Sequence, residues 1–118
     1  MKDYEVVTNA TVDFDNLETW EIAEIYGLDE EQEEIFIAAI ETIFTPKDAI
    51  WRIKNDKFEL NADVSTYEDL GYLYADILGL PEFAFDFFDF EYFGETIANK
   101  KNEDEEGWLT SYGWLTLK

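Results

Sequence analysis

The residues that most often do chemistry in proteins are scarce in this sequence. Its 118 residues include no Cys and no His, which removes the thiol nucleophile, the disulfide, the commonest general base and the commonest metal ligand. The glycine-rich phosphate loops and the G-x-S-x-G motif of serine hydrolases are absent as well. Carboxylates are abundant instead: 29 Asp and Glu against 8 Lys and Arg give a formal charge of −21 at pH 7.

One acidic stretch is spaced like the start of a calcium-binding loop. In NEDEEG, the residues Asn102, Asp104, Glu106 and Gly107 occupy the early ligand and turn positions of an EF-hand. The position that requires a bidentate Glu is Gly113, so we predict no metal here. Among 29 carboxylates, some pair would lie at the separation used by glycosidases by chance alone, and the sequence does not favour one pair over another. We therefore expect no enzyme and no cofactor.

The carboxylates are concentrated in two windows that contain no basic residue. No Lys or Arg lies between Asp3 and Pro46 or between Phe58 and Asn99, and these windows hold 13 and 10 carboxylates. A surface made only for solubility normally mixes both signs, because unbalanced charge costs stability. This charge excludes direct binding to nucleic acid or to anionic membranes. We expect a basic partner.

The chain is apolar enough to fold. Hydrophobic residues make up 47% of it and aromatic residues 18%, more than a disordered acidic tail contains. No apolar run approaches the roughly 18 residues that cross a bilayer, and the first residues do not resemble a signal peptide. Together with the absence of Cys, these features indicate a cytoplasmic protein.

Residues 16–63 are predicted to form a small helical unit, after an N-terminal strand or remnant at 1–15. Three helices follow one another, with turns brief enough for an antiparallel bundle, and a short strand near Phe58 and Leu60 ends the unit. The signals for these helices are a cap at Asn16, a stop at Gly27, a capping box at Asp29 and Gln32 for a helix through Phe44, and Thr45 before Pro46.

Residues 64–118 are predicted to form an α+β unit, which makes the chain an α+β protein. Ser65 and Glu68 form the S-x-x-E pattern of a capping box, and Gly79 ends the helix that follows. The apolar spacing predicts that this helix buries Tyr67, Leu70, Tyr74 and Ile77. After a polar linker at 98–107, the alternation in WLTSYGWLTL predicts a terminal hairpin around Tyr112 and Gly113.

The segment EFAFDFFDFEYFGE, residues 82–95, combines seven aromatic rings with five carboxylates. A membrane-seeking strip would carry basic residues, and an aggregation-prone strand would have low charge. We therefore predict two short helices, the second capped by Asp89, with the rings facing inward and the carboxylates outward.

The acidic surface itself is then the functional candidate. B-DNA carries one charge per about 1.7 Å of axis, so 21 charges correspond to roughly 36 Å, or about ten base pairs. A compact chain of this size has similar dimensions, so rows of carboxylates could occupy the basic groove of a DNA-binding enzyme. The candidate residues are Glu18, Glu21, Glu24, Glu30, Glu31, Glu34, Glu41, Asp76, Glu82, Asp86, Glu91 and Glu95.

Two other functions are compatible with the same charge. An anti-CRISPR protein could block the cationic nucleic-acid channel of a Cas effector. An acidic adaptor or structural subunit would need no such target.

Residues 66–117 resemble the ArdA antirestriction proteins of conjugative elements and phages. The resemblance is carried by YEDLGYLY, by Pro81 eight residues before DFEYFGETI, and by LTSYGWL, while residues 16–63 look like the family's middle domain. It implies an elongated acidic DNA mimic that inhibits type I restriction-modification enzymes inside the bacterial cell. It also implies dimerisation through the C-terminal domain, for which Trp108, Trp114 and Leu115 are the candidates. The equally weighted alternative is that these three residues close the core of their own unit.

The sequence also departs from the family. In this comparison we expect the family's N-terminal domain to be missing or reduced to KDYEVVTNATVDF. The antirestriction motif G-x-x-G-E-x-P is shortened to residues 78–81, and the family's R-D-L is replaced by residues 95–97.

Overall fold

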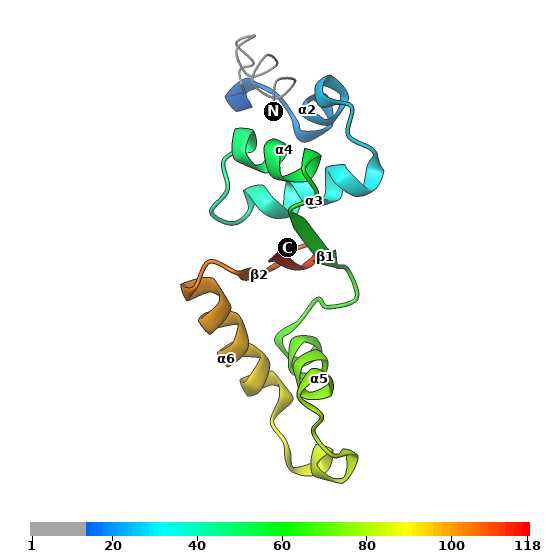
Figure 1. Cartoon of the computed structure of the whole chain (residues 1–118), viewed down its shortest axis with the longest axis vertical. Coiled ribbons are helices and arrows are strands. Elements are labelled where there is room, and N and C mark those ends of the chain that lie inside the picture. Colours follow the sequence, from blue (N-terminus) through cyan, green and yellow to red (C-terminus); the bar gives the residue numbers. More distant parts are fainter. Residues whose placement is uncertain (1–13) are drawn as a thin grey trace. The chain divides into compact units, whose positions relative to one another are not determined.

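The computed structural model describes residues 14–118 and confirms the α+β class (Figure 1). The chain divides into two compact units, one extending to Glu59 and including Lys118, the other running from Leu60 to Leu117. The division falls four residues before the expected boundary after Asp63. Most of the expected N-terminal segment 1–15 lies outside the described residues. Within residues 14–118, no helix is both long and apolar enough to cross a membrane.

The N-terminal unit contains the 3-10 helix η1 (Phe14–Asn16) and the helices α2 (Thr19–Tyr26), α3 (Glu30–Ile40) and α4 (Pro46–Lys54). The capping box before α3 is confirmed. The backbone N–H of Gln32 donates to Asp29 Oδ1 at 2.8 Å, and the backbone N–H of Asp29 donates to the side-chain Oε1 of Gln32 at 3.1 Å. Gly27 ends α2 in the left-handed conformation. The cap predicted at Asn16 is wrong, because Asn16 lies in η1 and Glu18 precedes α2.

The core of this unit forms where α3 and α4 meet. Phe36 and Ile50 are fully buried, and the ring of Phe44 packs edge-on against that of Phe58 at 5.0 Å. Helix α3 ends at Ile40, earlier than expected, so Ile43 leaves the buried face and is 56% exposed.

The C-terminal unit contains α5 (Tyr67–Leu78), the 3-10 helix η2 (Glu82–Phe87), α6 (Phe90–Glu103) and the strands β2 (Gly107–Thr110) and β3 (Gly113–Leu117). The predicted hairpin is confirmed, with β2 antiparallel to β3. Strand β1 (Phe58–Asn61) completes the sheet in the order β1-β3-β2. Figure 1 shows α5 and α6 side by side, with η2 at the end of the pair away from β2.

Helices α5 and α6 pack through small residues. Gly71 and Ala75 on α5, and Gly94 and Ala98 on α6, are all buried and are spaced four apart, so each pair lies on one helix face. The buried face predicted for α5 is therefore wrong in part. Leu70 is buried as expected, but Tyr67 and Ile77 are 38% and 63% exposed, because the close approach of the two backbones places large side chains beside the contact line.

Two local predictions for this unit need correction. Thr66, not Ser65, caps α5 and accepts a hydrogen bond from the Asp69 amide at 3.1 Å. Helix α6 continues to Glu103, so most of the expected linker is helical. The cap at Asp89 is confirmed, since Asp89 Oδ1 accepts from the Tyr92 amide at 3.0 Å.

The aromatic segment 82–95 is only partly turned inward. Phe90 is buried and contacts the rings of Tyr72, Phe85 and Phe88 at 4.0, 5.2 and 5.0 Å. Phe83 and Phe87, in contrast, are 80% and 89% exposed. The prediction that the rings face inward is therefore wrong for Phe83 and Phe87 on η2 and for Tyr92 on α6, which is 69% exposed, whereas Phe85 of η2 does face inward. Six residues of 3-10 helix cannot turn every ring toward a single neighbour.

Candidate functional site

The carboxylates of α2 are positioned by the start of that helix. Glu18 and Glu21 are linked by a hydrogen bond of 3.0 Å from the Glu18 amide to Glu21 Oε1, and Trp20 Nε1 donates to Glu18 Oε2 at 2.9 Å. Glu18 and Glu24 are exposed, while Glu21 is half-buried. Part of the acidic character of α2 therefore serves the helix itself.

Helix α3 presents the densest group of carboxylates in the N-terminal unit. Glu30 and Glu31 lie in its first turn, where the partial positive charge of the helix end favours acidic side chains. Both are exposed and Glu34 is half-buried, while Glu41 is exposed just after the helix. With Glu33, five like charges within twelve residues repel one another, and the fold of the unit tolerates that cost.

In the C-terminal unit all five candidate carboxylates are exposed. Asp76 lies near the end of α5, Glu82 and Asp86 lie on η2, and Glu91 and Glu95 lie on α6. The spacing of four residues between Glu91 and Glu95 places both on one face of α6. No Lys or Arg occurs between Phe58 and Asn99, so neither carboxylate has a basic residue within four positions in the sequence.

Four of the eight basic residues pair with carboxylates outside the candidate set. Arg52 pairs with Asp48 at 3.2 Å, and Lys118 pairs with Asp56 at 3.0 Å. Near the end of α6, Lys100 lies 3.6 Å from Asp104 and Lys101 lies 3.4 Å from Glu106. Within NEDEEG, Asn102 belongs to α6, and Asp104 and Glu106 pair with lysines near the end of that helix.

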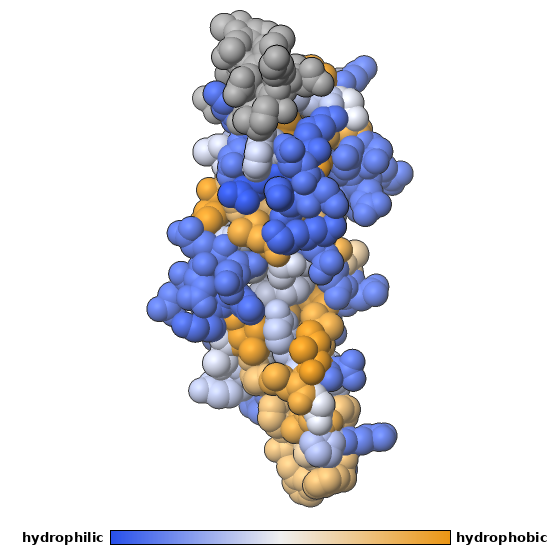
Figure 2. Space-filling model, in the orientation of Figure 1, coloured by the Kyte–Doolittle hydropathy of each residue, from blue (hydrophilic) through white to orange (hydrophobic). Residues whose placement is uncertain are grey.

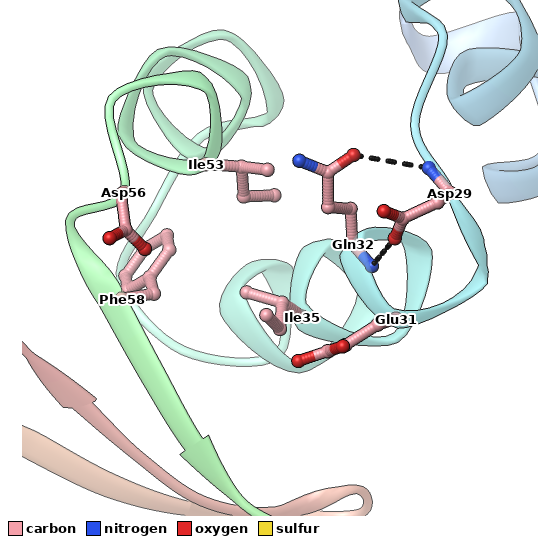
Figure 3. A pocket seen from close by; sticks show the side chains of 7 residues that line it. All are labelled: Asp29, Glu31, Gln32, Ile35, Ile53, Asp56 and Phe58. Atoms are coloured by element: carbon pink, nitrogen blue, oxygen red, sulfur yellow. Dashed lines mark hydrogen bonds between the residues drawn. The ribbon is translucent and has the colours of Figure 1, made fainter.

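A pocket of about 220 Å³ in the N-terminal unit is lined by three carboxylates (Figure 3). Figure 3 shows Ile35 and Ile53 on its apolar side, with Asp29, Glu31 and Asp56 around it. Asp29 is engaged in capping α3, and Asp56 pairs with Lys118. Two of its three carboxylates therefore have structural partners.

A second pocket, of about 560 Å³, lies in the C-terminal unit beside the start of α5. Glu68 and Glu91 line it together with Ser65 and Thr66. Next to it, hydrogen bonds from the Ser65 amide and hydroxyl, both 3.1 Å, hold the pKa of Asp69 below its usual value of 3.8. Across residues 14–118, no group of three or more acidic side chains is arranged to hold a metal ion.

The residues suggested for a dimer interface lie in the core of the C-terminal unit. Trp108, Trp114 and Leu115 are only 7%, 3% and 0% exposed. Trp114 packs with Val64, Leu70 and Ala98, so the hairpin closes the local core. Side chains buried in their own unit offer almost no surface to a second copy, so these residues are placed as core residues, and the dimer stays a prediction.

Sequence reasoning missed the exposed rings of η2. The signal that could have found them is Gly79 followed by Pro81, which ends α5 and leaves too few residues before Asp89 for a second amphipathic helix. Comparison of this chain with family models, with curated proteins and with solved structures gives no match.

Proposed function

We propose that this protein is a DNA mimic that inhibits a basic DNA-binding enzyme. The observation that carries the proposal is the placement of its charge. All twelve candidate carboxylates lie on the surface, ten exposed and two half-buried, in a chain of formal charge −21. The ion pairs of Arg52, Lys100, Lys101 and Lys118 involve other carboxylates.

The physical basis is the exchange of counterions. A cationic DNA channel holds small anions that DNA releases when it binds, and a folded polyanion releases them in the same way. The candidate carboxylates of α3, α5 and α6 sit on helices whose starts are capped by Asp29, Thr66 and Asp89. The backbone that carries them is therefore ordered before binding, which lowers the entropy lost on association. The protein would act stoichiometrically and without a cofactor.

The target we favour is a type I restriction-modification enzyme in the bacterial cytoplasm. This choice rests on the resemblance of residues 66–117 to the ArdA proteins. A Cas effector has a cationic channel of the same kind, so the experiment includes both.

The test is competition with DNA. Purified type I restriction-modification enzyme, or a Cas9-type effector with its guide, is mixed with labelled DNA and increasing amounts of the protein. We expect displacement of DNA at near-equimolar protein, weakening steeply between about 50 and 500 mM NaCl. Displacement that hardly changes with salt would contradict DNA mimicry. Displacement of DNA from the Cas effector alone would identify the protein as an anti-CRISPR protein and would contradict a restriction target.

A matched pair of variants controls for the total charge. One carries Glu→Gln changes at Glu30, Glu31, Glu34 and Glu41. The other neutralises residues 103–106, which lie beside Lys100 and Lys101. Both change the net charge by the same amount, so a larger loss in the first variant would assign inhibition to the candidate row.

A further inference from the structure

The end of the C-terminal unit that carries η2 exposes an unusual number of large apolar side chains. Phe83 and Phe87 on η2 are 80% and 89% exposed, and Leu78 at the end of α5 is 71% exposed. Tyr92 on α6 is 69% exposed. We call these four residues the apolar tip. Figure 2 shows the corresponding orange surface at the η2 end of the α5–α6 pair.

The apolar tip stands on a packed aromatic layer. Tyr72 from α5 stacks on Phe90 from α6 at 4.0 Å, and Phe85 from η2 contacts both rings, at 6.2 and 5.2 Å. Phe88 adds a further edge contact to Phe90 at 5.0 Å. Helices α5 and α6 thus hold η2 through the ring of Phe85, and the alternate rings of η2, Phe83 and Phe87, remain outside this layer.

A contiguous exposed apolar surface of this kind usually marks an interaction site. The charges around it decide which occupant fits. Asp76, Glu82, Asp86 and Glu91 surround or interrupt the apolar tip, and no basic residue occurs from Glu59 to Ala98. A second copy would bring the same carboxylates together, and an anionic membrane would repel them. A surface with Lys and Arg around an apolar pocket complements both features.

We infer that the apolar tip is an anchor that inserts Phe83 and Phe87 into an apolar pocket bordered by Lys and Arg on a basic protein. The identity of that partner rests on the proposed function. The chemistry of the partner's surface is inferred from the apolar tip itself. Duplex DNA keeps its aromatic bases stacked inside the helix and presents no protruding apolar ring of this kind. The anchor would therefore supply the part of the affinity that salt does not screen, and with it a choice among basic partners that carboxylates alone cannot make.

The test uses two synthetic peptides as probes. One is a Leu–Lys peptide of about 18 residues, long enough to form a helix with an apolar face between rows of lysines. The other has the same composition in an order that gives no apolar face. At about 300 mM NaCl, where charge attraction is largely screened, we expect the protein to bind the amphipathic peptide at least about tenfold more tightly.

Two double variants assign the effect. Phe83→Ser with Phe87→Ser should remove the preference between the peptides. Ile25→Ser with Ile43→Ser, which changes two exposed apolar residues of the N-terminal unit, should keep it. Equal binding of both peptides by the unchanged protein, or an unchanged preference in the Phe83/Phe87 variant, would overturn the inference. So would a dimer in sedimentation that this variant converts to a monomer, because the occupant would then be a second copy.

The peptide result is independent of the restriction assay. If the protein fails to displace DNA from either enzyme, the proposed function falls and the peptide comparison still decides the anchor. If the peptides bind equally, the anchor falls and DNA mimicry stands.

Discussion

Gly94 of α6 lies so close to Gly71 of α5 that a Cβ atom added to Gly94 would be 2.8 Å from the amide nitrogen of Gly71. It would also overlap the carbonyl group of Tyr67, and a Cβ on Gly71 would overlap the carbonyl of Phe90. These neighbours are backbone atoms, which cannot move aside as a flexible side chain can. The two glycines therefore set the separation of α5 and α6.

The first prediction concerns this contact. Gly94→Ala should force the two helices apart and lower the free energy of unfolding by more than about 2 kcal/mol, although alanine favours the helix. Glu95→Ala, the exposed neighbour on the same helix, should change it by less than about 0.5 kcal/mol. Urea unfolding followed by circular dichroism measures both. Equal stability of the two variants would mean that α5 and α6 do not pack as described.

The second prediction separates the aromatic residues that stabilise the fold from those that face solvent. Phe90→Ala removes the centre of the aromatic layer and should cost about 3–5 kcal/mol. Phe87→Ala changes a ring that is 89% exposed and should leave the melting temperature nearly unchanged. Thermal denaturation of both variants distinguishes the roles. A large loss from Phe87→Ala would show that the ring is covered, and the apolar tip would then have to be redefined.

The third prediction concerns the pH dependence of Asp69. Its pKa is lowered mainly by the hydrogen bond from the Ser65 amide, so its ionised form stabilises the folded state. This stabilisation is fully present above the ordinary value of 3.8 and is lost as pH falls through the lower folded-state pKa. Asp69→Asn should therefore be less stable than the parent at pH 7, and the difference should shrink at about pH 3 and below.

The control for this experiment is Asp76→Asn, an exposed carboxylate on the same helix. Its removal relieves repulsion and should leave stability unchanged or slightly raised at pH 7. Denaturant unfolding at several pH values gives both curves. If the deficit of Asp69→Asn were the same at every pH, the hydrogen bonds of Ser65 would not act through the charge of Asp69.

The fourth prediction describes how inhibition depends on the candidate carboxylates. Glu31→Gln alone should change the inhibitory concentration by less than about threefold, because an extended charged surface has no dominant contact. Adding Glu30→Gln, Glu34→Gln and Glu41→Gln should weaken inhibition progressively and lower its salt dependence. Titrations in the DNA competition assay give both quantities. Complete loss from one substitution would point to a single keyed contact instead of a charge row.

The sequence by itself determined most of the helix caps and stops, although the caps predicted at Asn16 and Ser65 are wrong. The capping box at Asp29 and Gln32, the caps at Thr45 and Asp89, and the helix ends at Gly27 and Gly79 are all found as predicted. Each of these depends on residues within about four positions of one another, so no knowledge of the tertiary fold is needed. The placement of the candidate carboxylates at the surface follows in the same way, because burying a charge is costly.

Only the tertiary structure decided which apolar residues are buried. Apolar spacing placed Tyr67 and Ile77 on the inner face of α5, but the approach of α6 selected Gly71 and Ala75 instead. Alternation in the hairpin could not distinguish a core from an interface at Trp108 and Trp114, and a core is what formed. Whether an apolar side chain is buried depends on which element packs against it and how closely. Its hydrophobicity is the same whether it is buried or exposed, so the sequence alone does not decide. Phe83 and Phe87 on η2 are exposed because no element packs against them among the described residues.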